Sequence, residues 1–349
     1  MSTTLGISMT SGLASCVLAL ATMATGACGG AVDGSFETSV DAATDGASSA
    51  DAATDDTGQT SFDAMTDTRD GGDAALVCSQ DGWCLERSPQ GKGSHVWGSG
   101  PNDVWLDFNH WNGSAWSSSP GGGVGWVQTA GIWGSGARDV WVWGFVFGAA
   151  HKLVHWDGSA WSDSQSGGDG IVGGSGPNDV WAVGSGGKIA HWNGSAWSSS
   201  AWSPWSSTVQ ALWGSGPSDE WGVGWNGGIV HFDGSAWSPS ASGTTKGLAS
   251  VWGSGPSNVW VVGAGGTILH WNGSAWAASA SATTNDLGGV WGSGPNDVWA
   301  VGGGGTIVHW NGSAWSPSAS GTTNTLVSVW GSGVSDVWIA GEGAILHRH

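Results

Sequence analysis

The sequence predicts an all-β fold, a seven-bladed β-propeller built of four-stranded blades. Three observations lead to this prediction: a phrase repeated seven times with a period near 40 residues, four short β-prone runs within each repeat, and no run with helical spacing of apolar residues. The chain has 349 residues, of which 65 are Gly, 30 are Trp and none is Tyr. This Gly content argues against long helices and favours short strands joined by tight turns.

The repeated phrase is clearest in residues 290–315, which read VWGSGPNDVWAVGGGGTIVHWNGSAW. Gly173 replaces its opening Trp once, and the other six copies have Trp97, Trp133, Trp213, Trp252, Trp291 and Trp330. Successive copies are 36, 40, 40, 39, 39 and 39 residues apart. A single unit of this kind cannot bury both faces of its sheet, so we expect the units to stack around an axis.

Each repeat is expected to form four strands, called a to d in chain order, with strand a innermost. In one repeat they cover 287–291, 298–301, 306–310 and the run from 314. Asn311 and Gly312 separate strands c and d. Both residue types accept positive φ, so this pair predicts a tight hairpin.

The numbers of strand motifs predict how the ring closes. Strand c carries a His in all seven repeats, namely His110, His155, His191, His231, His270, His309 and His347. The Gly-Ser-Ala-Trp motif of strand d occurs only six times, and the run Asp81-Gly82-Trp83 supplies the seventh copy. We therefore expect residues 77–90 to complete the last blade, which leaves no open edge strand.

Residues 1–27 resemble the signal peptide of a bacterial lipoprotein, which makes Cys28 the lipid attachment site. Residues 13–23 are mostly apolar, and the stretch is too short to span a membrane. Ordinary signal cleavage and a misassigned start are the alternatives, because the first 30 residues contain no Lys or Arg. Gly29 after the cysteine implies the outer membrane by the sorting rule of such lipoproteins. We expect an exported chain at the outer membrane or cell surface, or otherwise a periplasmic or secreted one.

Residues 28–76 are expected to form a disordered tether, followed by the propeller in residues 77–349. From residue 30 the tether holds 11 acidic residues and one basic residue among Ala, Thr, Ser and Gly, too few apolar groups to offset the entropy of ordering. Cys78 and Cys84 are candidates for a disulfide in an oxidising compartment. The propeller carries 16 acidic and seven basic residues, and this net charge of −9 argues against nucleic acid as a partner.

No catalytic residue, metal site or cofactor is predicted. The seven His residues recur once per blade around a ring and do not converge on one point. An Asp or Asn precedes each strand b and could bond to the His: Asp103, Asp139, Asp179, Asp219, Asn258, Asp297 and Asp336. A propeller hydrolase needs carboxylates near the axis, and the strand-a sequences contain no Asp or Glu, so we expect no enzyme activity.

Five Trp residues are not explained by the repeat: Trp126, Trp143, Trp202, Trp205 and Trp225. Trp143 replaces a Val of strand b and is expected in the core. Trp126, Trp202 and Trp205 are expected in d–a connections, and Trp225 in a b–c turn, all on one face of the disc. Exposed indoles on such loops could stack on sugar rings or anchor a protein, and local packing under longer loops is the alternative.

The repeat resembles those of Asp-box (sialidase-like) propellers, and most closely those of photosystem II assembly-factor-like proteins. The resemblance lies in the run Asp-Val-Trp-Ala-Val-Gly-x-Gly-Gly-Thr-Ile-x-His-Trp-Asn-Gly-Ser-Ala-Trp and covers residues 83–349. It implies a seven-bladed propeller and no catalytic residues, and the Asp box is shortened here to Trp-Asn-Gly-Ser-Ala-Trp. The acidic tether after Ala-Cys-Gly-Gly is similar to secreted lipoproteins of myxobacteria.

These observations predict a cell-surface, non-catalytic binding module. We expect a monomer that recognises a glycan, or an envelope or extracellular protein, through the face formed by the b–c turns and d–a connections. A structural or assembly factor of the cell envelope is the alternative, and a degenerate propeller hydrolase is the third hypothesis. The membrane is expected to be contacted through the lipid anchor only.

Overall fold

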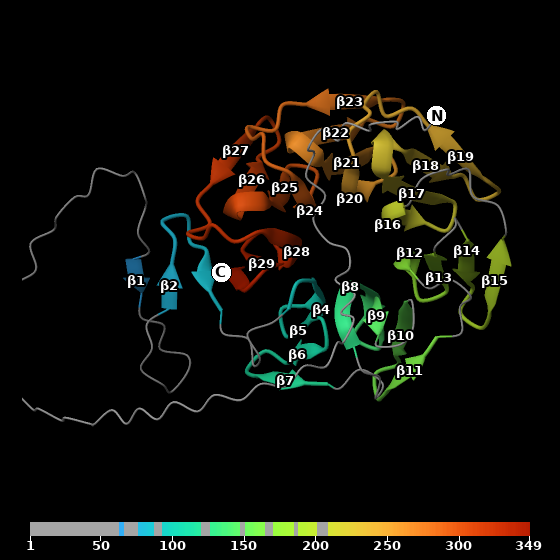
Figure 1. Cartoon of the computed structure of the whole chain (residues 1–349), viewed down its shortest axis with the longest axis horizontal. Helices are drawn as coiled ribbons and strands as arrows, with labels where there is room; N and C mark the ends of the chain where they lie inside the picture. Colours follow the sequence, from blue (N-terminus) through green and yellow to red (C-terminus); the bar gives the residue numbers. More distant parts are fainter. Residues whose placement is uncertain are drawn as a thin grey trace, which may run out of the picture. The chain divides into compact units, whose positions relative to one another are not determined.

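The computed structural model describes residues 63–65, 76–86, 93–119, 126–146, 151–164, 170–184, 188–200 and 209–349. All of them belong to one compact unit that begins at Gly58. Seven small antiparallel sheets stand around a common axis as the blades of a propeller (Figure 1). The all-β, seven-bladed prediction is therefore confirmed.

Each blade has its strands in the order a, b, c, d from the axis outward. Blades 1 to 3 consist of β4 (Val96–Gly100), β5 (Asp103–Leu106), β6 (Asn109–Trp111) and β7 (Trp116–Ser118); β8 (Trp126–Gly136), β9 (Asp139–Val146), β10 (Lys152–Trp156) and β11 (Trp161–Asp163); and β12 (Ile171–Gly176), β13 (Asp179–Val183), β14 (Ile189–Trp192) and β15 (Trp197–Ser200).

Blades 4 to 6 repeat this order with closely similar strand lengths. They consist of β16 (Val209–Gly216), β17 (Asp219–Gly224), β18 (Ile229–Phe232) and β19 (Trp237–Ser240); β20 (Leu248–Gly255), β21 (Asn258–Gly263), β22 (Thr267–Trp271) and β23 (Trp276–Ser279); and β24 (Leu287–Gly294), β25 (Asp297–Gly302), β26 (Thr306–Trp310) and β27 (Trp315–Ser318). Short 3-10 turns occupy the b–c connections, namely η2 (Trp225–Gly227), η3 (Ala264–Gly266) and η4 (Gly303–Gly305).

Blade 7 combines the two ends of the propeller sequence. Its inner strands are β28 (Leu326–Gly333), β29 (Asp336–Gly341) and β30 (Ala344–Arg348), and its outer strands are β3 (Cys84–Leu85), β2 (Leu76–Cys78) and β1 (Asp63–Met65). Cys84 pairs with His347, so the N-terminal segment supplies strand d as predicted. A disulfide joins Cys78 to Cys84, which confirms the predicted bridge.

The innermost strands form a closed ring. Strand a of each blade contacts strand a of the next all the way round, including β28 of blade 7 against β4 of blade 1. Trp252 of blade 5 shows how closely these strands approach. A Cβ placed on Gly292 of blade 6 would lie only 2.7 Å from Cη2 of Trp252. The indole of Trp252 therefore packs directly on the backbone of Gly292, where only glycine leaves enough room.

Tryptophan pairs hold neighbouring blades together. The strand-d Trp of each blade packs edge-on against the strand-b Trp of the preceding blade, with ring centroids 5.2–5.7 Å apart, in the pairs 116/338, 161/105, 197/141, 237/181, 276/221, 315/260 and 83/299. Such edge-to-face pairs contribute about 0.5–1.5 kcal/mol each beyond the burial of their area. Trp83 is fully buried, so the closing strand makes the same contact as the other six.

The c–d connections are tight hairpins, as predicted. In blade 1 the last strand pair is Trp111 with Trp116, so four residues form the turn. Gly113 has a φ of 91°, whereas Asn112 is not among the positive-φ residues. The Asn112 side-chain oxygen accepts hydrogen bonds from the backbone N–H of Ser114 and Ala115, at 3.0 and 2.9 Å. The asparagine therefore acts as a side-chain cap for the turn, and of the Asn-Gly pair only the glycine adopts positive φ.

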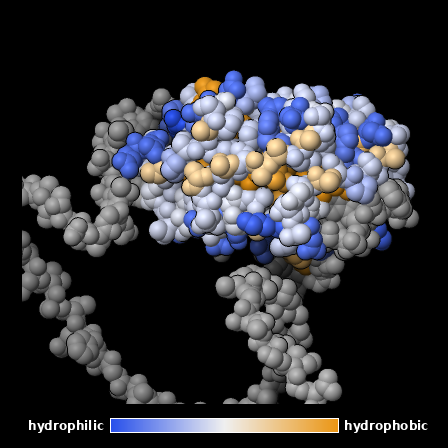
Figure 2. All heavy atoms as spheres, turned by 90° about the horizontal axis from the view of Figure 1, so that it is seen from above, coloured by the Kyte–Doolittle hydropathy of each residue, from blue (hydrophilic) through white to orange (hydrophobic). Residues whose placement is uncertain are grey.

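The side of the rim that Figure 2 shows is largely polar. Seen edge-on in Figure 2, the coloured residues of this side are mostly white and blue, and orange forms only a narrow broken row. None of the helices among the described residues is long and apolar enough to cross a membrane.

Candidate functional site

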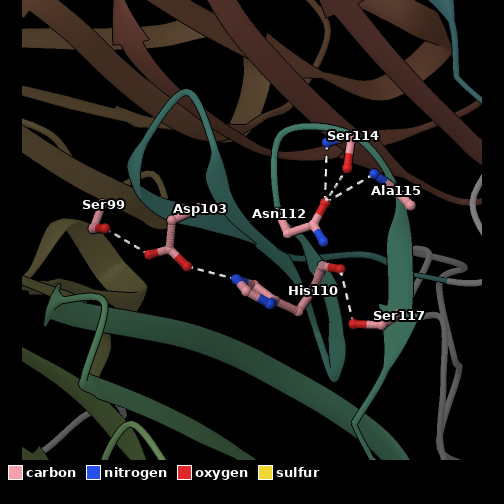
Figure 3. A network of polar contacts seen from close by, with 7 residues as sticks. All are labelled: Ser99, Asp103, His110, Asn112, Ser114, Ala115 and Ser117. Carbon is pink, nitrogen blue, oxygen red and sulfur yellow. Dashed lines mark hydrogen bonds and ion pairs between the residues drawn. The ribbon is translucent and has the colours of Figure 1, made fainter.

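A chain of four side chains links strands a, b and c within each blade. In blade 1 the Ser99 hydroxyl donates to Asp103 Oδ2 at 2.5 Å, and His110 Nε2 lies 2.6 Å from Asp103 Oδ1 (Figure 3). The His110 ring stacks on Trp105, with centroids 4.4 Å apart. Burial raises the pKa of Asp103 and the hydrogen bonds from His110 and Ser99 lower it, with a net decrease. Asp103 is therefore ionised at neutral pH, and His110 Nε2 carries the hydrogen of the shared bond.

The same network is present in all seven blades. The carboxylate or amide oxygen lies 2.5–2.7 Å from the His in the pairs 103/110, 139/155, 179/191, 219/231, 258/270, 297/309 and 336/347. Blade 5 has Asn258 in place of Asp, and burial lowers the pKa of its partner His270. The predicted Asp–His bonding is confirmed. A bond made once per blade ties each a–b turn to strand c, which is an architectural role.

Trp225 lies in a b–c turn, as predicted, and its side chain is exposed. It begins η2 and is 53 % accessible. Its ring lies against the backbone of the next d–a connection, because a Cβ on Gly247 would be 3.0 Å from Trp225 Cε3. The equivalent turns of blades 5 and 6 begin with Ala264 and Gly303. Trp225 therefore adds an aromatic surface at a place where these blades have none.

Two further aromatic residues come from blade 2. Trp126 is the first residue of β8 and pairs with Val146, so it lies in strand a and not in the d–a connection that the sequence predicts. The reason is that β8 and β9 continue their pairing further than in the other blades. Phe145, near the end of β9, is 43 % exposed and lies against His151, with ring centroids 4.4 Å apart.

The structure thus brings part of the predicted set to one face. Trp126 and Trp225 both lie at the end of their blades where b–c turns and d–a connections meet, in blades 2 and 4. Trp202, Trp205 and Cys28 lie outside the described residues. Trp143 is buried in the blade 2–3 core, as predicted. The sequence analysis did not select Phe145, although this aromatic residue stands in the longer b–c hairpin of blade 2.

A shallow cleft adjoins the turn of Trp225. It is lined by residues 227–229 of the b–c turn and 239–246 of the d–a connection. Most of these residues are Gly, Ser, Thr and Pro, and they offer hydroxyl and backbone groups to a ligand. Blade 6 has a similar cleft at the equivalent position, lined mainly by residues 304–308 and 317–323. The cleft is thus a repeated feature, and the exposed indole beside it in blade 4 is an additional one.

One buried carboxyl group breaks the sevenfold pattern. Glu220 stands in β17 where the other six blades have a buried Val, and it is fully buried. Neither of its carboxyl oxygens has a hydrogen-bond partner of normal geometry among the described residues. Burial, followed by the nearby charge of Asp179, raises the pKa of Glu220 to about 10. The group is therefore protonated in the folded chain at neutral pH.

Glu220 occupies the space that a Trp ring fills in other blades. A Cβ on Gly98, Gly253 or Gly331 would lie 2.5–2.6 Å from the strand-a Trp of the preceding blade. At Gly214 of blade 4 the same position is 2.1 Å from the Glu220 carboxyl carbon. The preceding blade has Gly173 where its strand-a Trp should stand. The Trp-to-Gly and Val-to-Glu differences are thus two parts of one local rearrangement.

Comparisons with known proteins support the fold and leave the function open. No protein-family profile and no curated protein sequence matches this chain. Among solved structures, it is similar to YCF48 from Cyanidioschyzon merolae, with 15 % identity, a TM-score of 0.59, and coverage of 77 % of this chain and 98 % of that one. A streptogramin B lyase structure has 12 % identity and a TM-score of 0.62, with coverage of 76 % and 95 %. A chain of a mitotic checkpoint complex has 13 % identity and a TM-score of 0.60, with coverage of 90 % and 99 %. At these identities the likeness concerns the propeller fold alone.

Proposed function

We propose that this chain is an exported, non-catalytic binding module that recognises its partner through the face of the b–c turns and d–a connections. The observation that carries the proposal is Trp225, an indole that is 53 % exposed on a turn where neighbouring blades have small residues. Exposing the apolar surface of an indole to water is unfavourable in the free protein. It is the kind of residue that contributes most strongly when a partner covers it.

The surroundings of Trp225 suit a carbohydrate or the surface of a protein. The indole supplies a flat apolar face, and the adjoining cleft supplies hydroxyl groups from Thr244 and Thr245. A sugar ring would stack on the indole and bond to the hydroxyl groups. A protein loop would bury the indole and bond to the same groups. Phe145 of blade 2 offers a second exposed ring on the same face of the propeller as Trp225.

The test is binding by the Trp225→Ala variant. The soluble chain from residue 29 is screened on a glycan array and in parallel against envelope extracts, and hits are measured by calorimetry. Loss of the Trp225 indole is expected to weaken binding at least tenfold. Val334→Ala is the matched control, because Val334 is 65 % exposed but lies in an a–b turn, on the other face.

Three results separate the hypotheses. Glycan binding that depends on Trp225 supports carbohydrate recognition. A stable envelope complex without glycan binding supports the assembly-factor role. Binding that Trp225→Ala and Phe145→Ala leave unchanged, with both variants folded, would show that this face is not the recognition surface.

We also propose that Cys28 carries the lipid anchor that holds the chain at the outer membrane. The support is the apolar stretch before it and the small residues around it. Cys28→Ser should release the chain from the membrane fraction into the soluble fraction. Unchanged membrane association of Cys28→Ser, together with unchanged electrophoretic mobility, would reject lipidation.

A further inference from the structure

Three side chains of the types that bind metals meet where the ring closes. Glu86 directly follows β3, His347 lies in β30, and His349 follows two residues later. One ligand atom from each of the three residues lies within 4.8 Å of the other two. Residues two apart on a strand face the same side, and the Cys84–His347 pairing places Glu86 on the side of His347. The cluster therefore spans the joint between the N-terminal closing strand and the last strand of blade 7.

His347 is held in one orientation. Its Nε2 lies 2.6 Å from Asp336 Oδ1, and its ring stacks on Trp338 with centroids 3.7 Å apart. Because the carboxylate accepts, Nε2 carries a hydrogen, and when the ring is neutral Nδ1 presents a lone pair. This is the arrangement in which metal-binding histidines are usually held, with the second nitrogen donating to a carboxylate.

The Nδ1 atom of His347 is the unusual part of this arrangement. It is buried and has no hydrogen-bond partner, which is true of no other histidine among the seven blade networks. Glu86 Oε1 lies 3.4 Å from it. The carboxylate of Glu86 favours a positive charge at this nitrogen, and either a proton on Nδ1 or a metal ion bound between the two groups supplies it. Arg348, which lies between His347 and His349 in the sequence, is directed elsewhere, over the ring of Trp299 at 5.0 Å.

We propose that Glu86, His347 and His349 bind one divalent transition-metal ion, with Zn²⁺ as the first choice. This ion would link the N-terminal closing strand to the last strand of blade 7. Two imidazole nitrogens and one carboxylate oxygen form a donor set that suits Zn²⁺ better than Ca²⁺ or Mg²⁺. A water molecule would complete a tetrahedral shell. None of the other six blades can form this site, because there strand c runs on into the Asn-Gly or Asp-Gly turn.

The location explains what the ion would do. Strand β3 has only two residues, Cys84 and Leu85, to pair with β30. An ion bound by Glu86 on one side and by His347 and His349 on the other adds a link between the two ends of the propeller sequence. Because the unfolded chain does not hold these residues together, metal binding would stabilise the closed ring by mass action.

The proposal is tested on the chain from residue 29, prepared without a polyhistidine tag and stripped of metal with a chelator. Calorimetric titration with ZnCl₂ should show saturable binding of one ion per chain. The melting temperature should rise with the logarithm of the Zn²⁺ concentration. Co²⁺ should give the visible absorption of a tetrahedral site, which reports on coordination independently of stability.

Two variants locate the ion. His349→Ala and Glu86→Gln should each weaken Zn²⁺ binding at least tenfold and abolish the Co²⁺ absorption, while the metal-free protein keeps its fold. Glu342→Gln, an exposed carboxylate of the same blade, and His151→Ala, a histidine of blade 2, are controls that should bind as the unchanged chain does. The proposal is overturned if the chain binds no Zn²⁺ saturably, which would mean that a proton alone satisfies His347. It is also overturned if both site variants bind Zn²⁺ unchanged.

Discussion

Replacing Glu220 by Gln should remove a pH-dependent loss of stability from this propeller. The carboxyl group is fully buried beside Asp179 and is neutral in the folded chain, with its pKa raised to about 10 from 4.5. Gln has nearly the same shape and does not titrate. The difference between the two proteins therefore isolates the proton on Glu220.

The direction in which pH changes the free energy of unfolding depends on whether the folded or the unfolded chain binds the proton. Between about pH 4.5 and about pH 10 the folded chain keeps a proton on Glu220 that the unfolded chain has released. The free energy of unfolding therefore falls as pH rises, by about 1.4 kcal/mol per pH unit for one proton. From about pH 6 to about pH 8 the contribution of Glu220 falls by roughly 2.7 kcal/mol. The slope does not depend on the value of the raised pKa, provided that it lies above the range measured.

The assay is urea unfolding of the unchanged chain and of Glu220→Gln at several pH values between 6 and 8 and at constant ionic strength. The difference in free energy of unfolding should change by about 1.4 kcal/mol per pH unit in favour of Gln as pH rises. Glu342→Gln controls for the loss of a carboxylate. Parallel pH profiles for the unchanged chain and Glu220→Gln would refute the reasoning, because Glu220 would then be ionised in the folded chain.

Three further substitutions test the packing. Gly173→Ala should cost about 1–3 kcal/mol, because its Cβ would lie 2.6 Å from Leu212 Cβ of the next blade; an unchanged urea midpoint would contradict this. Trp83→Ala should cost about 3–5 kcal/mol in the same assay and increase aggregation, because it removes the buried ring that closes blade 7. Asp297→Ala should cost about 1–3 kcal/mol by leaving His309 without its partner, whereas Asp297→Asn should be tolerated, as blade 5 uses Asn at this position; equal losses for the two would disprove a hydrogen-bonding role.

The fold and its closure were predictable because the same strand and turn motifs recur in all seven repeats. A seventh strand c without a seventh Gly-Ser-Ala-Trp left one strand to be supplied, and Trp83 was the residue that matched it. Its edge-on contact with Trp299 in the structure equals the contacts of the other blades. The Asp–His bonds were predictable for the same reason, since the two residue types always occur together.

Features that occur once were harder to predict, because they depend on contacts between blades. Gly173 was visible in the sequence as a missing Trp, and Glu220 as a missing Val, but their connection appears only when blades 3 and 4 lie side by side. Trp126 was misplaced because extended pairing of β8 with β9 cannot be read from turn residues. The cluster at Glu86 joins residues more than 250 positions apart, which no local pattern shows.

The distinction between repeated and unrepeated features also bears on where function lies. A group that recurs in all seven blades contributes equally around the axis, so it stabilises the ring but cannot by itself define a single asymmetric site. Recognition of one partner requires groups that break the symmetry. Among the described residues these are chiefly Trp225 and Phe145 on the loop face, and Glu86 with His347 and His349 at the closure. We propose that the first set meets a partner and that the second, through a bound metal ion, helps to hold together the scaffold that presents it. Substitutions in the two sets should therefore have different effects. Trp225→Ala should change binding without changing stability, and His349→Ala should change metal-dependent stability without changing the binding face.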